Sequence, residues 1–289
     1  MNMGELVEEI RIAKGISIKE LIDDNISRSF YYRFRKGDTD ISLENFFELL
    51  SSLNVTFDEI LMFVDFPDFA YLDECFTHKS SKLNQEFKEK SYDELVQLRE
   101  DYFEHGRLDV YYDHIAWIID MYIVIRFGVD YDERTIQQVK DYLKYTYQWF
   151  KHEMILFNQM YEFYTLDEIK VLLPRIHTYI RLNAEDVYLS YNLVFNLFIY
   201  ALEFGNTMLA IELYDMLNIN QVSEEAIIIR IQMIFMKEFV EELKLGYQVN
   251  DREKEIHSWI DVLSDLGYDT LAENFEYNYQ IALKGMKSA

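Results

Sequence analysis

Residues 27–37 read Ser-Arg-Ser-Phe-Tyr-Tyr-Arg-Phe-Arg-Lys-Gly, and this stretch decides how the first part of the chain is interpreted. Ser27 is a residue type that caps the N-terminus of a helix well. Tyr31 and Phe34 are three positions apart, so they share one face of the predicted helix. The stretch carries four basic side chains and no acidic one, although the net charge of the whole chain is −24. We therefore expect a short helix with a buried aromatic face and an exposed basic face.

The sequence around this helix predicts a small domain of five short helices. They cover residues 4–14, 18–23, 28–36, 43–52 and 57–64, with breaks at Gly15, Asp23-Asp24-Asn25, Gly37 and Asn54. Pro67 then marks a linker. We expect one domain over residues 1–65 and a second over 66–289.

The chain as a whole is predicted to be all-α. It has only 9 Gly and 2 Pro in 289 residues, too few for the many turns of a sheet protein. Several Ser or Thr residues are followed three positions later by Glu, the pattern of a capping box at the start of a helix. These pairs are Ser17 and Glu20, Thr56 and Glu59, Ser91 and Glu94, and Thr165 and Glu168.

Glycines divide the second domain into helix-sized pieces. Each of Gly106, Gly128, Gly205, Gly246 and Gly267 closes an amphipathic stretch. The spacing predicts helix pairs of about 40 residues, close to the period of tetratricopeptide repeats. Residues 200–217 fit one turn of such a repeat, because Gly205 separates two helices and the small Ala210 allows close packing. A tetratricopeptide-like array is favoured, and a generic helical bundle is the alternative.

The N-terminal pattern resembles the helix-turn-helix of the repressor-like XRE class. The resemblance rests on residues 9–17, 19–21, 27–37 and 40–46. Continued through Leu49, Leu53-Asn-Val55 and Asp58-Glu59, the pattern is similar to the Rgg/MutR family of Gram-positive regulators. The acidic helical remainder and the length near 290 residues fit that family too. The resemblance implies a DNA-binding head followed by a helical domain that binds short secreted and re-imported peptides.

The basic helix then becomes the candidate recognition helix, because the second helix of a helix-turn-helix lies in the major groove. Arg28 and Arg33 can each form paired hydrogen bonds with a guanine, worth about 1–3 kcal/mol of discrimination. Arg35 and Lys36 are placed for phosphates, and groups near the start of the preceding helix position the frame. The predicted DNA contacts are Ser17, Lys19, Arg28, Ser29, Tyr32, Arg33, Arg35 and Lys36. The alternative is a basic exposed helix with no partner.

Arg35 departs from the family pattern. Relatives usually carry an acidic residue at this position, and that residue pairs with the arginine at the position of Arg11. In this chain Arg35 faces Arg11 as a like charge. Either Arg35 turns outward to phosphate, or the domain is looser than its relatives, and Glu9 or Asp40 is available to take over the pairing.

Composition and charge exclude several classes of protein. The aromatic content, with 21 Phe and 23 Tyr, rules out a disordered chain. The longest uncharged run, Val187–Leu202, falls short of the roughly 20 apolar residues of a membrane-spanning helix. Acidic residues near Met1 are the opposite of a signal peptide, so we expect a cytoplasmic protein without membrane partners. Residues 1–64 hold 7 basic and 12 acidic side chains, so most of the negative charge belongs to the second domain.

The sequence contains no recognisable catalytic, metal or cofactor motif, so we expect no enzyme activity, no metal and no cofactor. The 6 histidines sit singly in the sequence. Cys75 has no partner cysteine; a buried thiol is favoured over an intersubunit disulfide or a redox-sensitive thiol.

Polar residues inside apolar helices of the second domain are candidates for peptide binding. Asn158, Asn192 and Asn196 lie among Leu, Phe and Tyr, and the last two are one helical turn apart. An amide both donates and accepts, so it can hold a peptide backbone. Hydrogen bonds between helices are the alternative. Arg175 and Arg181 are candidate partners for a peptide carboxylate.

These observations predict a homodimeric transcription regulator that reads an inverted-repeat DNA operator and senses a short signalling peptide, as in quorum sensing. Two heads are needed because one head contacts few bases. The alternative is a helical-repeat scaffold or anti-regulator whose DNA-binding head has decayed. An enzyme fused to a helix-turn-helix has no supporting motif.

Overall fold

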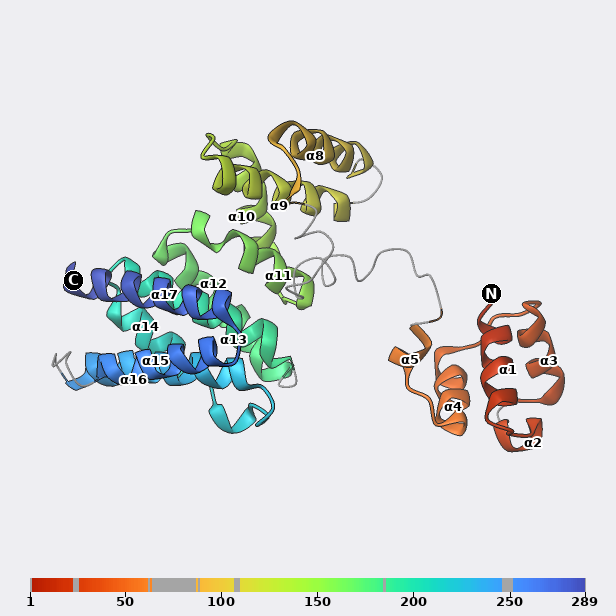
Figure 1. The fold of residues 1–289 in the computed structure, drawn as a ribbon. Coiled ribbons are helices and arrows are strands. Elements are labelled where there is room, and N and C mark those ends of the chain that lie inside the picture. The colour runs from red at the N-terminus through yellow and green to blue at the C-terminus, as the bar shows by residue number, and fades with distance from the viewer. Residues whose placement is uncertain are drawn as a thin grey trace. The chain divides into compact units, whose positions relative to one another are not determined.

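The computed structural model describes residues 2–22, 26–61, 63, 87, 89–106, 110–183, 186–245 and 252–288. Throughout these residues the regular structure is helical, which confirms the all-α prediction (Figure 1). The chain divides into two compact units, Met1–Ala70 and Tyr71–Ala289. Pro67, Cys75 and the predicted boundary near residue 66 lie outside the described residues.

The first unit is a bundle of short helices around one small core. Its helices are α1 (Met3–Ala13), α2 (Ile18–Leu21), α3 (Arg28–Lys36), α4 (Leu43–Leu53) and α5 (Phe57–Leu61). Tyr31 and Phe34 of α3 lie in the core beside Val7 of α1 and Leu49 of α4, and each of these side chains is buried. The recognition-helix candidate is therefore held to α1 and α4 by its aromatic face.

All four predicted capping boxes are present. In each pair the Glu carboxylate accepts from the backbone N–H of the Ser or Thr, and the hydroxyl accepts from the N–H of the Glu. Ser27 also caps α3, because its Oγ accepts from the N–H of Phe30 at 3.2 Å. The helix starts are thus defined by contacts between residues three positions apart.

The second unit is a stack of helices. The described helices are α8 (Tyr92–Gly106), α9 (Val110–Phe127), α10 (Glu133–Tyr145), α11 (Lys151–Met160), η1 (Tyr161–Phe163), α12 (Leu166–Leu182), α13 (Val187–Glu203), α14 (Thr207–Asp215), η2 (Ile219–Gln221), α15 (Ile227–Leu245), α16 (Arg252–Asp265) and α17 (Asp269–Ser288). Most helices contact the next helix along the chain or the next but one, as in a helical-repeat array. Gly106 ends α8, while Gly128, Gly205 and Gly267 follow helices with positive φ; Gly246 lies outside the described residues.

Helix α13 is the centre of this unit. It contacts α11, α12, α14 and α15, and it also packs against α17, which is far from it in sequence. Phe195 of α13, Phe235 of α15 and Phe275 of α17 have ring centroids 5.6–5.7 Å apart. A Cβ on Gly285 of α17 would lie 1.9 Å from the carbonyl oxygen of Leu202, so only glycine allows this approach. The long-range contact with α17 closes the stack around α13.

No helix among the described residues is long and apolar enough to cross a membrane.

Candidate nucleic-acid interface and ligand site

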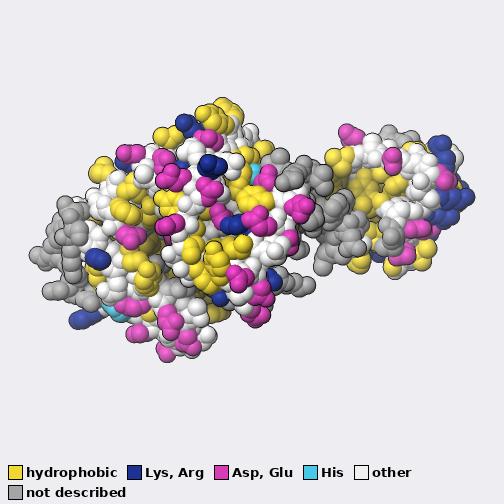
Figure 2. Space-filling model, turned by 90° about the horizontal axis from the view of Figure 1, so that it is seen from above, with side chains coloured by type: hydrophobic (Ala, Val, Ile, Leu, Met, Phe, Trp, Pro, Cys, Tyr) yellow, Lys and Arg dark blue, Asp and Glu magenta, His cyan; other side chains and the backbone are white. Residues whose placement is uncertain are grey.

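The outward face of α3 is basic and free of core packing. Arg28, Ser29, Tyr32 and Arg33 are all exposed, as is Lys36 in the last turn. Figure 2 shows basic side chains gathered at one end of the first unit, which is the lobe on the right. Ser17 and Lys19, at the start of α2, are exposed as well. The first turn of α3 contains no acidic residue, so its N-terminus presents backbone N–H groups and Arg28 without a competing carboxylate.

Glu8 of α1 anchors the inner side of this helix. Its carboxylate accepts from Arg11 Nε at 2.8 Å, from the Tyr31 hydroxyl at 2.7 Å and from Arg35 Nη1 at 3.0 Å. These donors, with Arg11 the strongest, hold the pKa of Glu8 at about 2, against an ordinary value of 4.5. One carboxylate thus joins α1 to two residues of α3.

Arg11 and Arg35 both pair with Glu8, so the two acidic partners suggested from the sequence, Glu9 and Asp40, are wrong. Neither Glu9 nor Asp40 forms the ion pair; Glu8 does. A helix repeats every 3.6 residues, so Glu8 shares a face with Arg11 three positions later, whereas Glu9 is exposed. The like charges of Arg11 and Arg35 share one anion, and the Arg35 guanidinium also lies 5.1 Å from the centre of the Tyr32 ring.

In the second unit, side-chain amides form hydrogen bonds across three helices. Asn196 Nδ2 of α13 donates to Asn158 Oδ1 of α11 at 3.1 Å. Gln232 Nε2 of α15 donates to Asn192 Oδ1 of α13 at 2.7 Å. Gln232 is 8% exposed, and its buried Oε1 has no hydrogen-bond partner in the described part of the chain. We call these four residues the amide ladder. Hydrogen bonds between helices were the alternative role for these asparagines, and the structure contains such bonds. Contact between the asparagines and a ligand stays a prediction.

Gln232 is not among the ligand-binding residues predicted from the sequence, although its surroundings in the sequence indicate such a role. It lies between Ile231 and Met233 in a helix of apolar residues, the same kind of setting that singled out Asn192. Its contact with Asn192 joins residues 40 positions apart, so the pairing itself could not be seen.

The two arginines proposed for a peptide carboxylate differ in their surroundings. Arg175 Nε donates to the Thr146 carbonyl at 3.0 Å, and its Nη2 donates to the Lys144 carbonyl at 2.7 Å. Its guanidinium therefore satisfies carbonyls at the C-terminus of α10. Arg181, in the last turn of α12, is exposed.

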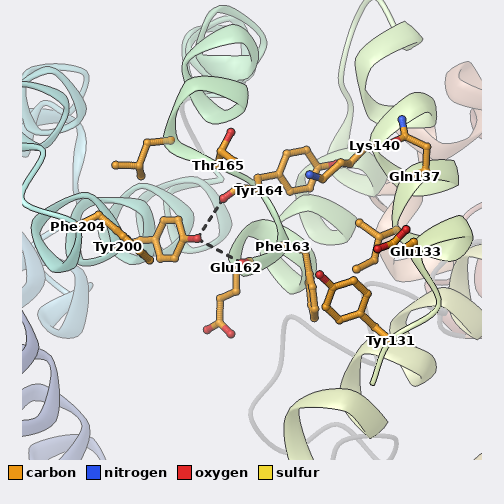
Figure 3. Close-up of a pocket in the computed structure, with 12 residues that line it drawn as sticks. Tyr131, Glu133, Gln137, Lys140, Glu162, Phe163, Tyr164, Thr165, Tyr200 and Phe204 are labelled. Carbon is orange, nitrogen blue, oxygen red and sulfur yellow. Dashed lines mark hydrogen bonds between the residues drawn. The ribbon is translucent and has the colours of Figure 1, made fainter. Parts of the chain in front are cut away.

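A cavity of about 700 Å³ opens in the second unit (Figure 3). Its walls come from α10, from η1 and the start of α12, and from the end of α13. The Tyr200 hydroxyl donates to the carbonyls of Tyr164, at 3.0 Å, and of Glu162, at 3.3 Å, which fixes one wall. Tyr200 follows Asn196 by one turn of α13, so this wall of the cavity begins one turn from the ladder.

Two histidines that sit singly in the sequence meet in the fold. His114 Nδ1 of α9 and His152 Nε2 of α11 are 2.7 Å apart, and the His114 ring stacks on Trp117 with centroids 4.6 Å apart. Burial, together with the neighbouring His152, lowers the pKa of His114 to about 3. Nearby, the buried Glu153 accepts from the Tyr142 hydroxyl at 2.5 Å. Among the described residues no group of three or more His, Cys, Asp or Glu could hold a metal ion.

Comparison with known proteins identifies relatives of both units. Residues 79–277 match the family model for the C-terminal domain of the HTH-type transcriptional regulator Rgg, and residues 7–60 match a helix-turn-helix model. No curated protein shows a significant sequence match.

Solved structures share the fold across nearly the whole chain. The SHP pheromone receptor Rgg2 of Streptococcus dysgalactiae is 22% identical with a TM-score of 0.77, covering 96% of this chain and 99% of that one. The PrgX/cCF10 complex is 11% identical with a TM-score of 0.72, covering 98% of this chain and 92% of that one.

Proposed function

The chain belongs to the Rgg family of HTH-type transcriptional regulators, and from this membership we propose that it binds operator DNA as a homodimer under the control of a short peptide pheromone. The proposed reading head is α3, and the proposed sensor is the helical second unit. The observation that carries the proposal is the exposed basic face of α3, held from behind by Glu8.

The DNA contacts follow from which side chains of α3 are free. Arg28 and Arg33 are exposed, with Ser29 and Tyr32 between them, and their proposed role is to contact base edges. Arg35 forms an ion pair with Glu8, so its proposed role is a phosphate contact at the periphery of the DNA interface. Ser17, Lys19 and Lys36 are proposed as backbone contacts. Because one such head touches few bases, two heads on an inverted repeat supply the affinity.

The amide ladder supports the peptide half of the proposal. The free Oε1 of buried Gln232 is an acceptor that a peptide N–H would satisfy, and an unpaired buried acceptor costs about 1–3 kcal/mol. Asn192 and Asn196 are separated by four residues, which is a rise of about 6 Å along α13. Alternate residues of an extended chain repeat at about 6.7 Å, so both amides can meet one peptide backbone. Arg181 is the proposed partner of a peptide carboxylate, and Arg175 would have to exchange its carbonyl partners to share that role.

Coupling between the units is proposed as a population shift. A peptide that binds one arrangement of the dimer more tightly changes the fraction of heads placed for DNA. The alternative of a decayed head is not favoured, because Arg35, which departs from the family pattern, forms an ion pair with Glu8.

Selection of binding sequences from a random DNA pool, with and without a peptide fraction of culture supernatant, tests this function. The wild-type protein should enrich an inverted repeat, and the fraction should change the amount retained. Arg28→Ala should weaken binding and relax one base position, whereas Arg134→Ala, an exposed arginine of α10, should not. Failure to enrich any sequence under both conditions contradicts the DNA half.

The peptide half has its own variants. Asn196→Ala should reduce the response to the peptide fraction while leaving DNA binding intact. Asn274→Ala, at an exposed position of α17, is the matched control. An unchanged response in Asn196→Ala removes the ladder from the proposed site.

A further inference from the structure

The cavity one turn from the amide ladder has an aromatic rim built from alternate connections of the helical stack. Tyr131 comes from the connection before α10, Phe163 from η1 before α12, and Phe204 from the end of α13. Tyr131 and Phe163 meet edge to face with centroids 5.9 Å apart, and Tyr200 and Phe204 do so at 4.9 Å. Figure 3 shows these rings around the opening. The rim therefore offers ring faces of the kind that attract cations.

The charge of the cavity is negative. Glu133 and Glu162 line it and are exposed. Lys140 also lines it, but its Nζ is bound to both oxygens of Glu168, at 3.0 and 2.8 Å. This pairing offsets the positive charge of Lys140, and within the described ranges neither Glu133 nor Glu162 forms an ion pair. Burial raises the pKa of Tyr200 in the cavity wall, and the nearby Glu203 and Glu162 raise it further.

A buried acceptor without a partner completes the site. Tyr164, whose side chain is 4% exposed, lines both the cavity and a smaller one of about 170 Å³ beside it. Its hydroxyl has no hydrogen-bond partner among the residues that the structure describes. A phenol oxygen can accept a hydrogen bond, and ammonium and guanidinium groups are donors. A cation with a long apolar stem would fill the space between the rings and reach this oxygen.

We propose that this cavity binds the basic side chain, arginine or lysine, of the peptide that controls the protein. The proposal rests on the proposed function, since it assumes a peptide along the amide ladder. The location of the cavity agrees with a peptide that lies along the amide ladder. Two residues of the cavity wall, Glu162 and Tyr200, follow the ladder residues Asn158 and Asn196 by four positions each. A peptide backbone bonded to the ladder places its next side chain at the cavity.

The test compares two fluorescein-labelled peptides, Leu-Val-Arg-Val-Leu and the same peptide with neutral citrulline in place of arginine. Fluorescence anisotropy is measured on the intact protein. The wild type should bind the arginine peptide about tenfold more tightly or better, because citrulline keeps the shape and loses the charge. The double variant Glu133→Gln and Glu162→Gln should bring the two affinities within about twofold. Glu273→Gln, at an exposed position of α17 outside the cavity, should keep the preference.

Three results would overturn the proposal: equal affinities in the wild type, a preference that survives in the double variant, or no binding of either peptide at about 1 mM. Asn196→Ala separates this site from the ladder. If the ladder holds the backbone, that variant weakens both peptides alike and preserves their ratio. If Asn196→Ala changes neither affinity, the ladder fails as a backbone site while the charge preference still reports on the cavity.

Discussion

Replacing Glu8 with glutamine is expected to loosen the first unit, because a single carboxylate joins α1 to α3. The amide keeps the size of the side chain and removes the charge that Arg11 and Arg35 share. The pKa of Glu8 falls from 4.5 to about 2 on folding, and each pKa unit corresponds to about 1.4 kcal/mol, so the upper limit is about 3 kcal/mol. Arg35 is one-third exposed, and solvent screens its share. We therefore expect a loss of about 1.5–3 kcal/mol.

The pH dependence of this contribution has a definite sign. A carboxylate whose pKa is depressed in the folded state stabilises the fold above its ordinary pKa, here 4.5. The stabilisation is lost as the pH falls from 4.5 through about 2, where the folded state also takes up the proton. Glu8→Gln should lack this component, so wild type and variant should converge in acid.

Hydrogen exchange on the intact protein measures the loss of stability in the first unit separately from the second. Backbone amides of α1 and α3 should exchange about 10- to 100-fold faster in Glu8→Gln at neutral pH, while those of α13 should be unchanged. The control is Glu9→Gln, which removes the same charge from the exposed neighbour. Equal exchange in the two variants would refute the reasoning that Glu8 fastens the two helices.

Two further predictions concern the second unit. The pKa of His114 is near 3 in the fold and 6.5 when unburied. The contribution of neutral His114 to the free energy of unfolding should therefore be complete above pH 6.5 and fall by up to about 1.4 kcal/mol per pH unit below it. His114→Gln should flatten this pH dependence in urea unfolding, and the same pH dependence in wild type and variant would contradict the assignment. Gly285→Ala should destabilise the unit by about 1–3 kcal/mol despite the higher helix propensity of alanine, because its Cβ meets the backbone of Leu202 and Glu203; a raised melting temperature would show that α17 can move away from α13 at little cost.

Local features could be predicted from the sequence because their partners are close along the chain. Each capping box joins residues three positions apart, so Ser17 and Thr165 could be recognised as helix starts without knowledge of the fold. The buried face of α3 follows in the same way from the spacing of Tyr31 and Phe34. The exposed basic face could then be inferred from the other residues of α3, which include Arg28 and Arg33.

Contacts between distant residues could not be predicted in this way. Arg35 and Glu8 are 27 residues apart, and choosing Glu8 over Glu9 requires the position of α3 against α1. His114 and His152 are 38 residues apart, and nothing near either one indicates the other. The cavity depends on three separate connections meeting at one edge of the stack, which the order of the aromatic residues along the chain does not show.

The stacking of Trp117 on His114 gives the protein an optical property of practical use. The chain has 3 tryptophans, Trp117, Trp149 and Trp259, and all lie in the second unit. Indole emission from the intact chain therefore reports on that unit alone, and the contact with His114 makes part of it sensitive to the state of the imidazole. In the proposed function, DNA binds at the first unit, which contains no tryptophan. A change in tryptophan fluorescence on adding operator DNA would thus be a direct signature of communication between the two units, measured without a label.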